Sequence, residues 1–214
     1  MSLLSHNWLI KRIASDHICD AIKRWGSGHT VDVGCGVKPY AYLFGKYTGI
    51  EFDLLRYESE PPHIWGSALD LPITDVSVDT VFSSQVLEHV TEPWRMVTEM
   101  ARILKPDGYF ILTAPHIWGL HEVPHDYYRF TPHGLQFLVE RAGLEMIEVI
   151  PMAGYWVTAG ARFCYYIRRF QKPFVGIFLK LLYAFVQIFS LILDRLHRVE
   201  TDAWNYIIIA KKRR

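Results

Sequence analysis

Apolar and polar positions along the chain form blocks that switch between helical and strand periodicity. Over 6–25 the apolar residues recur at helical spacing, whereas 30–33 and 47–52 are short apolar runs that predict buried strands. A third strand is expected at 80–84, and a helix is expected over 92–104. This order of elements is typical of an α/β domain.

The same series of elements continues in the second half of the chain. A Lys-Pro-Asp-Gly stretch at 105–108 is expected to stop the preceding helix, and 109–113 is the next predicted strand. A helix over 131–142 starts with a Thr-Pro pair, which suits an N-cap and a first helical position. Strands are expected at 144–150 and 205–210. The alternation predicts a parallel sheet with helices on both faces.

A glycine-rich turn follows the first expected strand. Gly34 and Gly36 would let the backbone approach a ligand where a Cβ would clash, although they also suit a plain strand-to-helix turn. An acid at the tip of the second strand can accept both ribose hydroxyls of an adenosine; Glu51 is the first candidate and Asp53 the alternative. Pro39 stands where the dinucleotide fingerprint has its third glycine, which argues against a nicotinamide oxidoreductase.

Several motifs, in order along the chain, resemble one protein family. VDVGCG, GIE, ALDLPITDVSVDTVFSSQVLEHV and EMARILKPDGYFILTAP, within residues 28–150, are similar to the motifs of class I S-adenosylmethionine-dependent methyltransferases. The resemblance implies an α/β, Rossmann-like, doubly wound fold with a mostly parallel seven-stranded sheet whose last strand is antiparallel. It also implies S-adenosylmethionine as the cofactor and methyl transfer as the reaction.

The resemblance further implies which residues bind the cofactor. Asp32 and the two glycines would line its methionine end, and Glu51 would hold the ribose. The family's Gly-Asp-Ala pattern is Gly-Ser-Ala here, so Asp70 is the candidate for the missing carboxylate. Glu88 and His89 are expected to organise the following helix rather than to act in catalysis. The full candidate cofactor set is Asp32, Gly34, Cys35, Gly36, Glu51, Phe52, Ala68, Leu69, Asp70 and Gln85.

The loop after the 109–113 strand is long and rich in titratable side chains, and it leaves the sheet edge where ligands bind in such folds. The candidates for contact with the acceptor are His121, His125, Asp126 and Arg129. His125 or His121 could be a general base, and Arg129 could hold a carboxylate or phosphate. Alternatively, Asp126 and Arg129 pair within the loop. A metal site of His121, Glu122, His125 and Asp126 is a further alternative, but spacing alone does not define one and no metal is assigned.

The stretch HEVPHDYYRFT within this loop resembles a methyltransferase subgroup that is associated with glycan or lipopolysaccharide biosynthesis. This resemblance implies O-methylation of a sugar, glycan or lipid-linked acceptor. One rival hypothesis keeps the enzyme but replaces the acceptor with a quinone or another small apolar molecule. Another is a non-catalytic protein that binds S-adenosylmethionine or serves as a scaffold.

A helical insertion, 151–203, is expected between the last two strands of a single domain over 1–214. From Pro173 onward the less apolar residues are spaced by four and three, which predicts a helix with one narrow polar stripe: Gly176, Lys180, Tyr183, Gln187, Ser190, Asp194 and His197. A single membrane crossing is disfavoured because both flanking strands belong to one sheet. We expect 155–198 to lie at an anionic membrane surface, either as a helix in the interface or as a re-entrant helical pair. Packing on its own domain, or on a second copy in a homodimer, is the alternative.

Charge is distributed unevenly along the chain. Residues 1–159 carry 12 Lys and Arg against 19 Asp and Glu, whereas 160–214 carry 11 against 3. Basic side chains in the insertion would suit anionic headgroups: Arg162, Arg168, Arg169 and Lys172. The three cysteines have no paired spacing, and the first residues do not form a secretory signal. These features predict a cytoplasmic protein, peripheral at the inner face of the membrane, with no nucleic-acid partner.

Overall fold

The chain forms two compact units in the computed structural model, which describes residues 2–53, 59–172 and 176–214. The larger, here called the sheet unit, comprises Cys19–Pro115, Leu120–Ile150 and Tyr206–Arg214. The smaller, here called the helical unit, comprises Met1–Ile18, His116–Gly119 and Pro151–Asn205. Helix α1 (Trp8–Trp25) contributes residues to both units.

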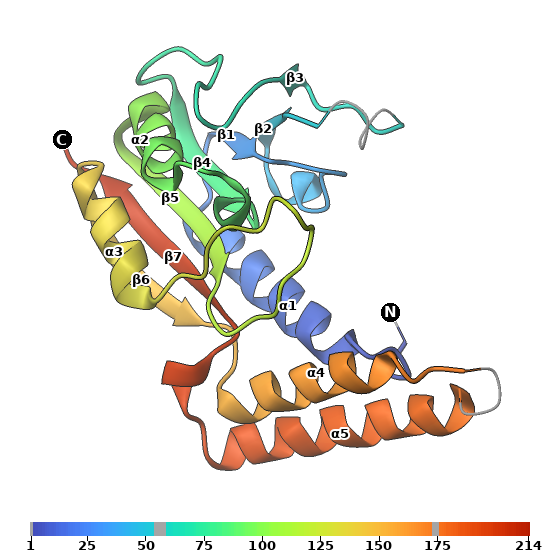
Figure 1. The fold of residues 1–214 in the computed structure, drawn as a ribbon. Coiled ribbons are helices and arrows are strands. Elements are labelled where there is room, and N and C mark those ends of the chain that lie inside the picture. The colour runs from blue at the N-terminus through green and yellow to red at the C-terminus, as the bar shows by residue number, and fades with distance from the viewer. Residues whose placement is uncertain (1, 54–58, 173–175) are drawn as a thin grey trace. The chain divides into compact units, whose positions relative to one another are not determined.

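A seven-stranded sheet in the order β3-β2-β1-β4-β5-β7-β6 lies at the centre of the sheet unit (Figure 1). Its strands are β1 (His29–Val33), β2 (Lys46–Glu51), β3 (Ile64–Trp65), β4 (Val78–Ser84), β5 (Leu104–Pro115), β6 (Leu144–Pro151) and β7 (Asn205–Lys212). β1 pairs in parallel with β2 and β4, and Asp32 lies opposite Gly49 and Phe82. β7 is antiparallel to the rest. The carboxyl ends of β1, β2 and β4 therefore share one edge of the sheet.

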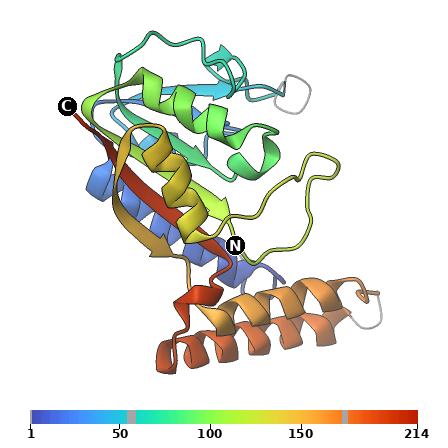
Figure 2. The same cartoon turned by 60° about the vertical axis from the view of Figure 1, so that its left-hand side comes forward.

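Helices cover the sheet, as expected for strands that are buried on both faces. α2 (Pro93–Ile103) and α3 (Pro132–Arg141) lie on one face, and the last turns of α1 lie on the other (Figures 1 and 2). The predicted start of α3 is confirmed, because Thr131 Oγ1 accepts a hydrogen bond from the backbone amide of Gly134 at 3.0 Å. A short 3-10 turn, η2 (Leu87–His89), follows β4.

The predicted fold class is confirmed: the sheet is seven-stranded, mostly parallel and antiparallel only at β7. The prediction that 105–108 separates a helix from a strand is wrong, because β5 already begins at Leu104. Val78 pairs with Leu104 and Thr80 with Tyr109, so the register shift places the Pro-Asp-Gly turn within the strand as a bulge. The two-residue strand β3 was too short to produce a periodic signal.

Two antiparallel helices, α4 (Tyr155–Arg168) and α5 (Gly176–Leu196), lie side by side in the helical unit (Figure 2). The helical character of the predicted insertion over 151–203 is confirmed, although Pro173, where its apolar helix was expected to start, lies outside the described residues. The face of α5 that is buried consists largely of the predicted polar stripe: Leu179, Tyr183, Gln187, Ser190 and Asp194. Its exposed face is apolar: Ile177, Phe178, Leu181, Phe185, Ile188, Phe189, Ile192 and Leu196. This polarity is the reverse of that in a helix on a water-soluble surface.

The buried stripe of α5 satisfies backbone groups at the starts of other helices. Asp194 accepts hydrogen bonds from the amides of Gly154 and Val157, at 3.0 and 3.4 Å, at the N-terminus of α4. Gln187 accepts one from the amide of Leu9 at 2.9 Å, in the first turn of α1. These amides have no partner within their own helix, so the polar side chains of α5 replace the water that would otherwise bind them.

We predict that Asp194→Ala lowers the free energy of unfolding of the helical unit by about 1–3 kcal/mol, because two buried amides of α4 lose their acceptor. Chemical denaturation followed by circular dichroism measures the change. Asp16→Ala is the matched control, because the Asp16 carboxylate is exposed and forms only a surface ion pair with Arg12. An equal effect in the two variants would contradict a capping role for Asp194.

Candidate functional site

Two adjoining cavities lie at the carboxyl ends of β1, β2 and β4, within the sheet unit. The first has a volume of about 280 Å³ and is lined by Val33, Gly34, Ile50, Glu51, Phe52, Gly66, Ser67, Ala68, Leu69, Val86, His89, Val90, Thr91 and Tyr127. The second has a volume of about 480 Å³ and is lined by Gly34, Cys35, Gly36, Val37, Pro39, Glu51, Asp53, Ser84, Gln85, Val86, His89 and Glu122. They share Gly34, Glu51, Val86 and His89, so they form one cleft at the edge where α/β sheets bind ligands.

The predicted glycine turn forms the floor of this cleft. Gly34 has φ +74°, and a Cβ at this position would lie 2.3 Å from Val86 Cγ2. The amides of Gly34 and Cys35 both donate to the carbonyl oxygen of Ile50, at 2.9 and 3.0 Å, which ties the turn to the end of β2. Only glycine combines this backbone conformation with so close an approach to Val86.

The carboxylate of Glu51 closes the turn from the other side. Its Oε2 accepts a hydrogen bond from the amide of Gly36 at 2.9 Å, and its Oε1 accepts one from the amide of Phe52 at 2.8 Å. Glu51 lines both cavities, whereas Asp53 lines only the second. Because both oxygens are fixed by backbone amides, Glu51 can present their remaining lone pairs to a pair of hydroxyl groups.

The other predicted cofactor residues are divided by the structure. Phe52, Ala68 and Leu69 line the first cavity, and Cys35 and Gln85 line the second. Gln85 has φ +58°, and its Nε2 donates to Thr113 Oγ1 at 3.0 Å, which fixes it at the end of β4. Asp70 is exposed and lines neither cavity, and its amide bonds to the carbonyl of Ser67.

Asp32 lies behind the cleft rather than in it. Its side chain is buried and lines neither cavity, and the hydroxyl of Tyr47 donates to Oδ2 at 2.7 Å. Burial raises the pKa of Asp32 to about 7, the Tyr47 hydrogen bond opposes this rise, and the charge of Glu51 adds to it. Burial likewise raises the pKa of the Cys35 thiol to about 12, so this cysteine is not an activated nucleophile.

In the loop after β5, Asp126 and Arg129 form an ion pair. Arg129 Nη1 and Nη2 donate to Oδ1 and Oδ2 of Asp126, each at 2.7 Å, and Oδ2 also accepts from the amide of His121 at 2.8 Å. The Arg129 hydrogen bonds hold the pKa of Asp126 far below its usual range. The geometry thus favours the alternative in which this pair fixes the loop.

The two candidate histidines of the loop have different surroundings. His125 is exposed, and its Nδ1 lies 3.0 Å from the hydroxyl of Tyr127, which lines the first cavity. His121 is half-buried and faces other side chains of the protein through both ring nitrogens. His125 is therefore the better placed of the two to contact an acceptor.

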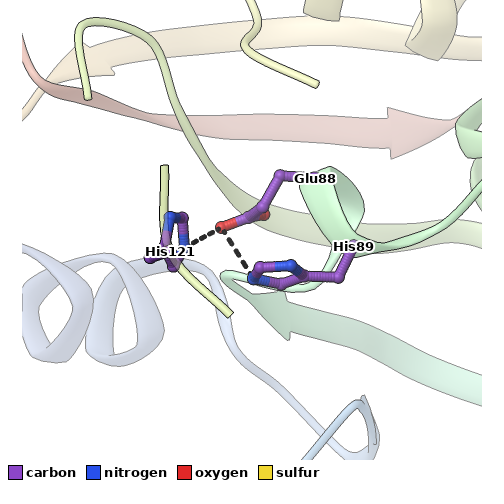
Figure 3. A group of neighbouring side chains, drawn as sticks. All are labelled: Glu88, His89 and His121. Carbon is purple, nitrogen blue, oxygen red and sulfur yellow. Dashed lines mark ion pairs between the residues drawn. The ribbon is translucent and has the colours of Figure 1, made fainter. Parts of the chain in front are cut away.

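Three side chains whose proximity the sequence analysis did not predict lie beside the cleft: Glu88, His89 and His121 (Figure 3). Glu88 is buried in η2, and its Oε1 lies 3.7 Å from Nε2 of His89 and 3.7 Å from Nε2 of His121. His89, for which the motif indicated only a structural role, lines both cavities. The two parts of this group are distant in the sequence, so only a tertiary contact between η2 and the loop reveals it.

Comparison with known proteins indicates the class of this domain. Residues 31–112 match the family model described as a methyltransferase domain. An uncharacterized methyltransferase from Mycobacterium sp. (strain JLS) is 36% identical over 111 residues, which cover 45% of this chain and 44% of that protein. One from Mycobacterium bovis (strain BCG / Pasteur 1173P2) is 35% identical over 114 residues, covering 46% and 44%. The chain thus matches less than half the length of these relatives.

Solved structures share the whole fold at low sequence identity. A SAM-dependent methyltransferase from Thermotoga maritima has a TM-score of 0.60 at 18% identity, covering 97% of this chain and 93% of that one. The [4+2]-cyclase SpnF has a TM-score of 0.62 at 19% identity, covering 94% and 82%. Phosphoethanolamine N-methyltransferase 2 from Haemonchus contortus, solved with S-adenosyl-L-methionine, has a TM-score of 0.59 at 16% identity, covering 93% and 53%.

Residues 31–112 thus resemble a methyltransferase domain, the solved structures show a Rossmann-like fold, and the comparisons support S-adenosylmethionine as the cofactor. The match to the family model covers the end of β1, all of β2, β3 and β4, and most of β5, and so includes the strand ends that build the cleft. The loop that carries His121 and His125 and the helices α4 and α5 lie outside it.

We predict that Asp32 makes the protein less stable as pH rises from about 4 to 7. The folded state keeps the proton up to a pKa of about 7, whereas the unfolded chain releases it near 3.8, so the folded state binds more protons in that window. The loss from this group is at most about 4 kcal/mol. Denaturation of the wild-type protein and of Asp32→Asn across this pH range isolates the contribution of Asp32. The unfolding free energy of the wild type minus that of the variant should fall as pH rises, and a constant difference would contradict the prediction.

Proposed function

We propose that this protein transfers the methyl group of S-adenosylmethionine to a hydroxyl of a sugar, glycan or lipid-linked acceptor. The observation that carries the proposal is the closed glycine turn, in which Glu51 lies between two adjoining cavities inside a segment that matches a methyltransferase domain. When bound, the cofactor supplies a methyl group on a sulfonium centre, which an acceptor oxygen displaces in line.

The residues of the cleft fit an adenosine with an attached amino-acid chain. Glu51 offers two fixed carboxylate oxygens to the ribose hydroxyls, and Phe52 and Leu69 provide apolar surface in the first cavity for a purine ring. The glycine turn and Gln85 line the second cavity, where a more polar chain can lie against backbone. The chain itself then mainly has to position donor and acceptor and to exclude water from the displacement.

We assign contact with the acceptor to the loop after β5. The ion pair of Asp126 and Arg129 fixes the path of the loop, and the exposed ring of His125 is placed to receive the proton of a hydroxyl group. Tyr127, next to the His125 ring and in the wall of the first cavity, links this histidine to the cofactor pocket.

We further propose that the exposed face of α5 binds an anionic membrane surface on the cytoplasmic side of the cell. α5 is long and apolar enough to span a membrane, but the polar stripe on its inner face is used in hydrogen bonds to other helices. An orientation along the interface leaves those bonds intact and buries the apolar face in lipid. Arg168, Arg169 and Lys172 lie exposed near the end of α4, where they can contact headgroup phosphates.

Two variants should affect cofactor binding and methyl transfer differently. Glu51→Ala is expected to weaken the binding of S-adenosylmethionine at least tenfold, measured by calorimetry, because the turn and the ribose lose the same carboxylate.

His125→Ala should keep the wild-type cofactor affinity but lose about 10²-fold or more in methyl transfer to a glycolipid extract. His133→Ala, an exposed histidine on α3, is the control and should match the wild type. Binding of NAD in place of S-adenosylmethionine, or transfer only to a quinone fraction, would contradict the proposal.

Membrane binding has its own prediction. The wild-type protein should sediment with vesicles that contain anionic phospholipid, and the triple variant Phe178→Ser, Phe185→Ser, Phe189→Ser should bind at least tenfold more weakly, because three exposed rings leave the apolar face. Phe137→Ser, which changes a similarly exposed ring on α3, is the matched control. The proposal would be contradicted if the wild-type protein did not bind the vesicles and formed a dimer, whereas the triple variant was a monomer. That result would show that a second copy covers α5 instead.

A further inference from the structure

Glu88 is a buried carboxylate that lacks a hydrogen-bond partner among the residues described by the structure. Its side chain has 0% exposure, and neither Oε1 nor Oε2 receives a hydrogen bond there. Burying an ionised carboxylate is strongly unfavourable unless a cation or donors lie close to it. Arg129 supplies some attraction, since its pKa is raised mainly by Asp126 and in smaller part by Glu88. Nε2 of His89 and Nε2 of His121 each lie 3.7 Å from Glu88 Oε1.

The tautomer of His89 is determined by its other ring nitrogen. Nδ1 lies 2.6 Å from the carbonyl oxygen of His125, and a carbonyl can only accept, so Nδ1 carries the hydrogen. In the neutral ring, Nε2 therefore presents a lone pair to Glu88 Oε1, which is 3.7 Å away. Two electron-rich atoms facing each other need a positive charge between them, either a proton or a metal ion.

A proton alone does not account well for the spacing. A hydrogen bond between an imidazolium and a carboxylate would bring the nitrogen and oxygen to about 2.7–2.9 Å. Both His89 and His121 instead place Nε2 at 3.7 Å from the same oxygen, on two sides of it (Figure 3). The three ligand atoms all lie within 4.8 Å of one another. This separation resembles that of ligands around one ion, which are about 3.4 Å apart for tetrahedral zinc.

The partners of His121 can support the same role. Its Nδ1 lies 3.4 Å from Oδ2 of Asp126 and 3.3 Å from Nη2 of Arg129, so the ring can adopt either tautomer. With the hydrogen on Nδ1, directed at Asp126, Nε2 is left unprotonated toward Glu88. A carboxylate or carbonyl behind each histidine is the usual arrangement around a bound metal: Asp126 stands behind His121, and the carbonyl of His125 behind His89.

We propose that Glu88 Oε1, His89 Nε2 and His121 Nε2 bind one divalent transition-metal ion of the zinc type. Two imidazoles and one carboxylate are a common ligand set for such an ion and leave at least one coordination position open. The Glu88 oxygen has to approach each histidine nitrogen by about 0.3 Å to reach the tetrahedral spacing, and the widest ligand pair, which lies within 4.8 Å, has to close by up to about 1.4 Å. His89 lines both cavities, so the open position borders the cleft.

The catalytic use of this ion rests on the proposed function. With the ion bound, an acceptor hydroxyl in the open position would lose its proton to His125 more readily, because the ion would stabilise the alkoxide. The oxygen then forms a bond to the methyl carbon as the carbon–sulfur bond breaks, and the sulfur keeps the electron pair. The ion itself undergoes no redox change.

The test is a titration of the full-length, tag-free protein with Co²⁺, which gives a strong visible absorption only in a low-coordinate site, followed by competition with Zn²⁺. We expect one ion per chain, and at least tenfold weaker binding in Glu88→Gln and in His121→Ala. His133→Ala, on the exposed surface of α3, should bind as the wild type does. Thermal unfolding of each variant shows whether it is folded; because His121 is partly exposed, its variant should remain folded even if Glu88→Gln does not.

The outcomes separate this inference from the proposed function. An absent Co²⁺ band, or equal affinity in wild type and folded His121→Ala, overturns the metal site, whether or not calorimetry shows S-adenosylmethionine binding. A specific one-to-one site in a protein that does not bind S-adenosylmethionine supports the metal site and contradicts the proposed function. A site that binds, together with methyl transfer that a chelator abolishes and Zn²⁺ restores, supports both.

Discussion

The parallel pairing of β1 with β2 and β4 is the constraint on which the candidate site depends. It brings three strand ends to one edge of the sheet, so that the turn after β1, the acid of β2 and Gln85 after β4 meet around one cleft. The hydrogen bonds from the amide of Gly36 to Glu51 and from those of Gly34 and Cys35 to Ile50 then lock the turn against β2. The residues that line the cleft are thereby positioned by backbone geometry rather than by flexible side chains.

In the helical unit, the placement of polar and apolar side chains is reversed. Its long helix α5 uses polar side chains inside and apolar ones outside, because Gln187 and Asp194 take the place of water at the ends of neighbouring helices. In water such a helix exposes an unfavourable surface, whereas at a lipid interface the same surface is stabilising. This difference supports the proposal that the exposed face of α5 binds a membrane surface.

Fold similarity alone does not define the reaction, since SpnF, a [4+2]-cyclase, shares this architecture with methyltransferases. The side chains for which we propose roles at the cleft beyond cofactor binding lie in the loop after β5 and in η2. There the ion pair of Asp126 and Arg129 fixes the loop, and Glu88 meets two histidines beside the cleft. These groups lie outside the part of the cleft that is built by the glycine turn, on the side to which we assign contact with the acceptor.

The sequence by itself indicated most of the strands and helices, the glycine turn and the position of Glu51, because these depend on local periodicity and on short motifs. It also predicted the polar stripe of α5, but periodicity cannot tell which face of a helix is buried; only packing against α4 and α1 placed Gln187 and Asp194 inside. Similarly, the motif suggested that Asp32 contacts the cofactor, whereas the tertiary structure buries it beneath Tyr47. The meeting of Glu88 and His89 with His121 was decided by the path of a long loop, because contacts between residues distant in the sequence leave no periodic signal.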